Sequence, residues 1–195
     1  MRPLLLLGVA AMLAGCASAP ADRGPLSAEA ILKDKDGKQV GVATLIETPE
    51  GVRLAVTGYR LPPGGHGLHI HVVGLCEPPE FTSAGAHFNP GSKQHGRMNP
   101  AGPHAGDLPN LVVAASGEGG LDITTKAITL SPGPNSVLGD KPTALVVHAN
   151  PDDDKTDPTG NSGGRIACGV ITKQPRAGSS RTRPVVFLAA AKPVT

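Results

Sequence analysis

Short runs of alternating apolar and polar residues, separated by turns rich in glycine and proline, recur along this chain. The first four runs span residues 28–32, 39–46, 52–59 and 67–73, and the turns between them read KDGK, TPEG and LPPGG. A two-residue apolar period is typical of β-strands with one buried face. No segment keeps a 3.6-residue apolar period, so we expect few and short helices. The pattern predicts an all-β fold.

Four more candidate strands follow in the second half of the chain. They span residues 111–115, 121–130, 144–148 and 166–171. About eight short antiparallel strands favour a Greek-key β-barrel or β-sandwich.

Two long connections interrupt this rhythm. Residues 74–110 and 149–165 are rich in glycine, proline, aspartate and histidine, and they show no alternation. Long ordered loops in compact domains usually carry function, because their ordering costs conformational entropy. We therefore expect two functional loops on the β-scaffold.

The two ends of the chain differ from the part between them. The opening MRPLLLLGVAAMLAGC places one arginine before an apolar run that ends in small residues, the layout of a secretory signal. Its last four residues resemble a bacterial lipobox, in which the cysteine, here Cys16, is acylated; an ordinary cleaved signal peptide is the alternative. We predict a lipoprotein-type signal peptide at 1–15, a flexible tether at 16–27, one domain at 28–172 and a basic, disordered tail at 173–195. An added edge strand at 185–188 is the alternative for the tail.

Composition limits the partners and the redox state of the chain. A formal net charge of +2, one tyrosine and no tryptophan argue against a nucleic-acid partner. If Cys16 carries lipid, Cys76 and Cys168 remain as an even pair in an oxidising compartment, where we expect them to form one disulfide. Two buried free thiols are the alternative if export fails.

All seven histidines lie between positions 66 and 148. His69 and His71 alternate with apolar residues in LHIHV, so they share one face of a strand. Imidazole suits copper and zinc, and histidines with one aspartate can complete a tetrahedral zinc site. The other candidates are His87 in GAHFNP, His95 in KQHGR, His104 and Asp107 in GPHAGDLPN, and His148 in LVVHANPDDD.

Five motifs resemble those of the copper/zinc superoxide dismutases. They read GLHIHVVGLC, GAHFNPGSKQHG, GPHAGDLPN, ALVVHANPDD and TGNSGGRIACGVI, and the resemblance extends over residues 27–172. It implies one copper and one zinc per subunit. Copper would be held by His69, His71, His87 and His148, and zinc by His87, His95, His104 and Asp107.

The resemblance also implies roles for residues beyond these ligands. Arg165 matches the arginine that meets the anionic substrate beside copper, and His87 matches the histidine that bridges both metals and takes up a proton during turnover. Asp152 matches a carboxylate that links a copper histidine to a zinc histidine; a solvated member of the DDD run is the alternative. Cys76 and Cys168 match the disulfide of the family, and His66 matches a structural position.

The implied activity is the disproportionation of superoxide to dioxygen and hydrogen peroxide, by copper redox cycling beside a structural zinc, in protection of the cell envelope. Together with the lipobox, it predicts an exported, periplasm-facing lipoprotein, anchored to a membrane through Cys16. The alternatives are a non-catalytic envelope carrier or buffer of copper and zinc, and a structural β-domain stabilised by metals. Monomer and homodimer both stay open.

Overall fold

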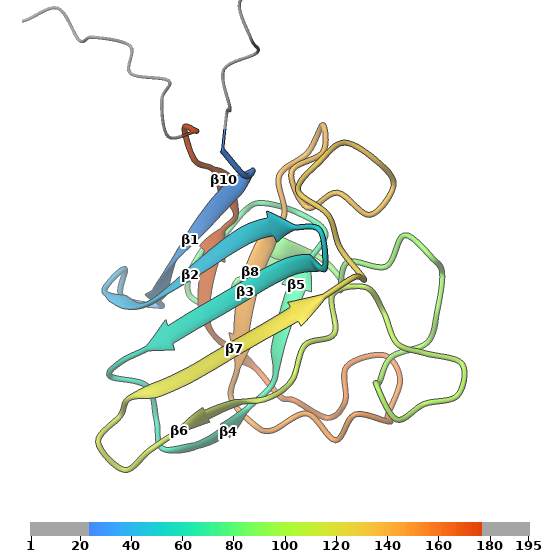
Figure 1. The fold of residues 1–195 in the computed structure, drawn as a ribbon. Helices are drawn as coiled ribbons and strands as arrows, with labels where there is room; N and C mark the ends of the chain where they lie inside the picture. Colours follow the sequence, from blue (N-terminus) through green and yellow to red (C-terminus); the bar gives the residue numbers. More distant parts are fainter. Residues whose placement is uncertain (1–23, 177–195) are drawn as a thin grey trace, which may run out of the picture.

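The computed structural model describes residues 24–176, which contain ten β-strands and one 3₁₀ turn joined by loops (Figure 1). Cys16, the predicted signal peptide, most of the tether and residues 177–195 lie outside the described residues. The elements are β1 (Ser27–Asp34), β2 (Gln39–Thr48), β3 (Gly51–Gly58), β4 (Gly64–His66), β5 (Leu68–His71), η1 (Thr82–Ala84), β6 (Leu111–Val113), β7 (Gly119–Thr125), β8 (Ala144–His148), β9 (Arg165–Val170) and β10 (Thr172–Lys173).

The strands form one antiparallel sheet that curves into a nearly closed barrel (Figure 1). Its order is β4-β6-β7-β3-β2-β1-β9-β8-β5, with β10 paired to β1. The two end strands, β4 and β5, are consecutive in the chain, with only Gly67 between them. The pairs β3–β7 and β1–β9 join strands far apart in sequence, as Greek-key connections do. The predicted all-β barrel is confirmed.

The alternation read from the sequence becomes the wall of the core. Along β3, Val52, Leu54 and Val56 are buried and Arg53 between them is exposed. Each fully buried Val or Leu side chain stabilises the fold by about 1.5–3 kcal/mol relative to an exposed one. One continuous apolar cluster inside the barrel therefore holds the strands together.

Strands β5 and β8 differ from the others because both of their faces are buried. The two predicted loops, observed at residues 72–110 and 149–164, are the long connections that follow these two strands. Polar side chains on the outer face of β5, including His69 and His71, are thereby removed from solvent.

Two predicted strands, 67–73 and 121–130, differ from the structure by several residues. Within 67–73 only Leu68–His71 is a strand (β5), and β4 before it covers Gly64–His66, partly within the predicted turn LPPGG. The Gly67 amide between the two strands donates to Asn150 O at 2.8 Å, and the chain passes there from one sheet edge to the other. The run 121–130 ends as a strand at Thr125, since the amides of Leu130 and Ser131 donate to the Glu47 carboxylate instead of to a strand.

The first residues of the predicted tail extend the sheet. Lys173 pairs with Ala28, and the Gln174 amide donates to Ser27 O at 2.9 Å, which defines β10. Within residues 24–176, no helix is long and apolar enough to cross a membrane.

Candidate metal centre

Four imidazoles gather on the outer face of β5 and β8. His69 and His71 lie on β5, His148 ends β8, and a bridge between His71 and His87 brings in the loop that follows β5. All four side chains are buried, and ligand atoms from the four lie within 4.8 Å of one another. We call these four residues the first group.

Backbone carbonyls fix two of these rings. His71 Nδ1 donates to Gly85 O at 2.9 Å, and His148 Nδ1 donates to Gly163 O at 3.1 Å. A neutral imidazole that donates from Nδ1 keeps a lone pair on Nε2. The two Nε2 atoms lie 3.4 Å apart, so both lone pairs are available at one place.

The other two rings of the first group leave buried nitrogens without partners. His69 donates from Nε2 to Asp152 Oδ2 at 2.7 Å, and its Nδ1 has no hydrogen-bond partner among the described residues. His87 Nε2 likewise has no hydrogen-bond partner among these residues. Buried polar atoms without a partner are rare and costly, and a metal ion would complete both. Four imidazoles suit copper, so these residues fit that ion.

A second group converges on one carboxylate oxygen. Asp107 Oδ1 lies 3.0 Å from His87 Nδ1, 3.1 Å from His95 Nδ1 and 3.2 Å from His104 Nδ1. His95 Nδ1 is a third buried nitrogen that has no hydrogen-bond partner of acceptable geometry in the described part of the chain. Three imidazole nitrogens and one carboxylate oxygen make a donor set that suits tetrahedral zinc.

His87 belongs to both groups: its Nδ1 lies beside Asp107, and its Nε2 has no partner among residues 24–176. Ligand atoms of His69 also lie within 4.8 Å of those of His87, His95 and Asp107. Distance alone therefore does not choose between His69 and His104 for the second group.

Asp152 links the two groups through its two oxygens. Oδ2 accepts from His69, and Oδ1 lies 3.0 Å from His95 Nε2. Asn110 fixes this aspartate, because its amide group donates to Asp152 O and accepts from Asp152 N. Gly160, at φ 61°, packs so closely that an added Cβ would collide with the Asp152 carboxylate. The Asp152 carboxylate is wholly buried, unlike a solvated member of an acidic run.

Sequence reasoning missed Asn110 and Gly160. Asn110 closes the GPHAGDLPN motif, so its position was a signal that went unused. The role of Gly160 depends on tertiary packing, which the sequence does not display.

Burial keeps three rings of the first group neutral, those of His71, His87 and His148. Desolvation lowers the pKa of His71 to about 2 and that of His148 to about 3. It also lowers the pKa of His87 to about 4, against the opposing contact with Asp107. Metal ligands must be deprotonated, so these imidazoles offer lone pairs near pH 7 without first losing a proton.

In the second group, the pKa of His95 is shifted in the opposite direction. Burial would lower the pKa of His95, but Asp107 and Asp152 outweigh it and raise that pKa to about 10. Burial likewise opposes the charge of both aspartates, yet their histidine partners hold both carboxyl pKa values well below the usual range. In the metal-free protein both ring nitrogens of His95 are therefore protonated near pH 7. A cation at this site would displace one of these two protons.

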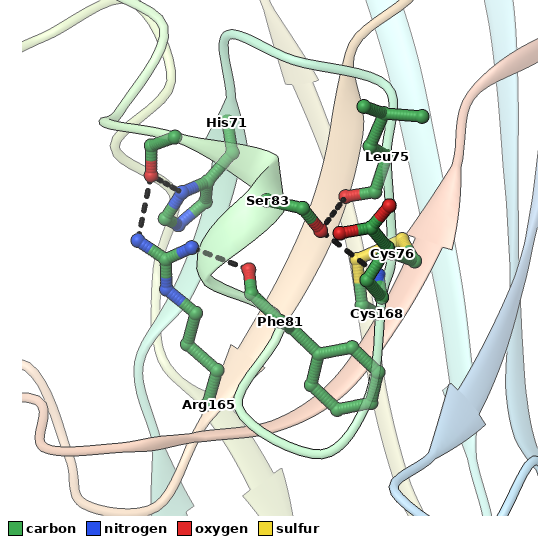
Figure 2. Close-up of a disulfide and its surroundings, with 9 residues drawn as sticks. His71, Leu75, Cys76, Phe81, Ser83, Arg165 and Cys168 are labelled. Atoms are coloured by element: carbon green, nitrogen blue, oxygen red, sulfur yellow. Dashed lines mark hydrogen bonds between the residues drawn. A yellow bond between two sulfur atoms is a disulfide. The ribbon is translucent and has the colours of Figure 1, made fainter.

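Arg165 lies beside the first group. Its Nη1 donates to Phe81 O and its Nη2 to Gly85 O, both at 2.6 Å. Gly85 O also accepts from His71, so Arg165 and His71 meet at one oxygen (Figure 2). Burial lowers the pKa of Arg165, but a guanidinium stays charged at any physiological pH.

The predicted disulfide between Cys76 and Cys168 is present, with the two Cα atoms 5.6 Å apart. It joins the loop after β5 to β9, three residues beyond Arg165. His66 lies in neither group. Its ring contacts His148 O and Pro62 O, both at 2.8 Å, which is a structural arrangement.

Fold and site together define a β-barrel protein with two adjoining, histidine-rich groups suited to metal ions. A family model described as copper/zinc superoxide dismutase matches residues 39–171. The chain belongs to the copper/zinc superoxide dismutase family, whose members are oxidoreductases.

Named relatives and solved structures agree with this assignment. The chain is 45% identical over 148 residues to superoxide dismutase [Cu-Zn] 1 of Aquifex aeolicus, covering 75% of this chain and 88% of that one. It is 43% identical over 148 residues to superoxide dismutase [Cu-Zn] of Caulobacter vibrioides, covering 74% and 85%. The crystal structure of a SOD-like protein from Bacillus subtilis superposes with a TM-score of 0.71 at 38% identity, covering 74% and 97%.

Proposed function

We propose that this chain is a superoxide dismutase that binds one copper and one zinc. The first group, His69, His71, His87 and His148, would hold copper. The second group would hold zinc through His87, His95, His104 and Asp107. Copper bound there supplies the redox chemistry that converts two superoxide ions and two protons into dioxygen and hydrogen peroxide.

His104 is preferred to His69 as the fourth zinc ligand because of what each ring already contacts. His104 Nδ1 lies 3.2 Å from Asp107 Oδ1 and 3.4 Å from His87 Nδ1, among the donors of the second group. His69 lies on β5 with His71, where it completes the first group. With this division each group has four ligands, and only His87 is shared.

The protein's own residues attract the substrate and hold a proton. Arg165 presents a fixed positive charge beside the first group, which draws superoxide, an anion, toward it. His87 can hold a proton at Nε2, which has no hydrogen-bond partner within residues 24–176, while its Nδ1 stays beside Asp107. Imidazole is well suited to such transfers near neutral pH.

The observation that carries this proposal is the shared carbonyl of Gly85, which joins Arg165 to His71. A carrier or buffer needs the imidazoles but gains nothing from a half-buried, oriented guanidinium at their edge. We expect the copper- and zinc-loaded protein to consume superoxide far faster than the metal-free protein. Full loading without superoxide consumption would favour the carrier.

We also propose that the chain is exported, acylated at Cys16 and anchored to a membrane facing the periplasm. The disulfide supports an oxidising compartment, and several relatives are bacterial. The proposal suits a monomer and a homodimer alike, because one chain supplies every ligand of both sites.

A further inference from the structure

The segment from Cys76 to Gly85, which we call the disulfide loop, carries both carbonyls that hold Arg165. Phe81 O and Gly85 O lie near its end, and Cys76 at its start is bonded to Cys168 on β9. The loop is therefore fixed covalently at one end, while the carbonyls that orient the guanidinium are at the other.

One side chain ties these two ends together. Ser83 Oγ accepts from the Glu77 amide at 2.8 Å and donates to Leu75 O at 3.2 Å, on either side of Cys76 (Figure 2). Ser83 lies in the 3₁₀ turn between Phe81 and Gly85. Its hydroxyl thus connects the backbone around the disulfide to the turn that presents the two carbonyls.

This turn needs such support, because its first carbonyl comes from an unfavourable backbone conformation. Phe81 has φ 52°, in the left-handed region that bulky residues rarely adopt. Its ring is buried in a small cluster that includes Cys168 and Val146, and its amide donates to Glu77 O at 3.0 Å. Glu77 therefore contacts both Phe81 and Ser83.

We infer that Ser83 is a positioning residue: its hydroxyl holds the disulfide loop so that the carbonyls of Phe81 and Gly85 aim the Arg165 guanidinium beside His71. The inference rests on the proposed function, since it assigns to Arg165 the capture of superoxide. It assigns Ser83 no contact with metal or substrate.

The first test uses metal-free protein and a Ser83→Ala variant. The variant leaves the Glu77 amide without its acceptor, so we expect hydrogen exchange at this amide and reduction of the disulfide by dithiothreitol each to accelerate about fivefold, the worth of one hydrogen bond. Thr82→Ala is the matched control, because Thr82 is exposed and its hydroxyl makes no hydrogen bond in the described part of the chain. Ser83→Thr, which keeps a hydroxyl, should restore the wild-type rates.

The second test separates positioning from a merely structural role. In fully loaded protein, Ser83→Ala should lower kcat/KM for superoxide about fivefold. The kcat/KM of the variant should also fall less steeply with added salt than that of the wild-type protein. In an Arg165→Ala background the same change should have no further effect, because the two residues act as one unit. Equal losses in both backgrounds, or an unchanged salt dependence, would overturn the inference.

The outcomes also distinguish this inference from the proposed function. A fully loaded wild-type protein that consumes no superoxide refutes the proposed function, and the inference, as stated, falls with it. An active wild-type protein whose rate and salt dependence do not change with Ser83→Ala refutes the inference alone. If the alanine variant does not fold, exchange at the Glu77 amide in wild-type protein decides, and a rate equal to that of an unstructured peptide overturns the inference.

Discussion

Asp152 and His69 form a 2.7 Å hydrogen bond, and both side chains are fully buried. The contact fixes which nitrogen of His69 is protonated and leaves Nδ1 for the first group. Because the other oxygen of Asp152 contacts His95, one carboxylate orients a ring in each group.

Replacing Asp152 with alanine should therefore weaken both metal sites. Removing a partner that orients a metal ligand typically costs about 10–100-fold in affinity, so we expect losses of this size for copper and for zinc. Competition with chelators of known affinity measures them. A loss confined to one metal would show that Asp152 orients only one ring.

Arg165→Ile should lower the catalytic rate constant while the fold and both metals are retained. Phe81 O keeps a donor in the Ala84 amide and Gly85 O keeps His71 Nδ1, so neither carbonyl is left without a partner. We expect at least about a tenfold decrease, together with a shallower decline with added salt. Arg165→Lys, which keeps a charge but not the two-pronged contact, should lie between. Unchanged rate and salt slope at full metal content would remove Arg165 from the mechanism.

His104→Ala should lower zinc content more than copper content. The ring of His104 contacts Asp107 and His87 Nδ1 and makes no contact with the ring nitrogens proposed to hold copper. Metal analysis after dialysis is the measurement, with thermal unfolding to report the lost stability. Equal loss of both metals would contradict the division of ligands proposed above.

The metal-free protein should be most stable near neutral pH. The pKa values of His71, His148 and His87 are lowered to about 2, 3 and 4 from 6.5, so the unfolded chain binds more protons as pH falls below 6.5, and the free energy of unfolding falls with it. His95 acts in the opposite direction, because its pKa is raised to about 10. Its contribution to the free energy of unfolding is complete below pH 6.5 and is lost as pH rises through 10. Denaturant titrations from pH 4.5 to about 10 test both limbs. A metal-free protein that gains stability between pH 7 and pH 5 would contradict this prediction.

Cys16→Ser should release the mature protein from membranes. Acylation requires the thiol, and a single serine substitution leaves the residues of the barrel unchanged. Detergent partitioning of cell fractions measures the effect. Continued fractionation of the processed variant with membranes would refute the lipid anchor and leave the metal sites unaffected.

The sequence predicted the strands well where each strand keeps one set of neighbours. β8 was predicted at its observed bounds, and β3 was displaced by one residue, because alternation reports burial directly. It failed at β4, because Gly64, Gly65 and His66 show no apolar alternation although they pair with β6, and the partner strand changes to β8 after Gly67. A pattern of burial cannot report such a change of partner.

The side chains of the site were predictable for a similar reason, since imidazoles and carboxylates show their chemistry in the sequence. The groups that the prediction did not include are mostly backbone atoms. The carbonyls of Phe81, Gly85 and Gly163 orient Arg165, His71 and His148, and every residue type carries such a carbonyl. Which one faces a given ring depends on how the loops fold back over β5 and β8.

The pairing of β10 with β1 sets the side of the barrel at which an anchored form would be attached. The chain enters the barrel at Ser27 and leaves it at Gln174, and these residues share a hydrogen bond. The points at which the chain enters and leaves the barrel therefore lie side by side. In Figure 1 the turn around residues 90–105 and the loop 149–164 lie on the side away from these two points. A lipid on Cys16, eleven residues before Ser27, would attach the barrel within about 40 Å of a bilayer, at the side away from these two loops, and would leave the loops accessible to dissolved superoxide.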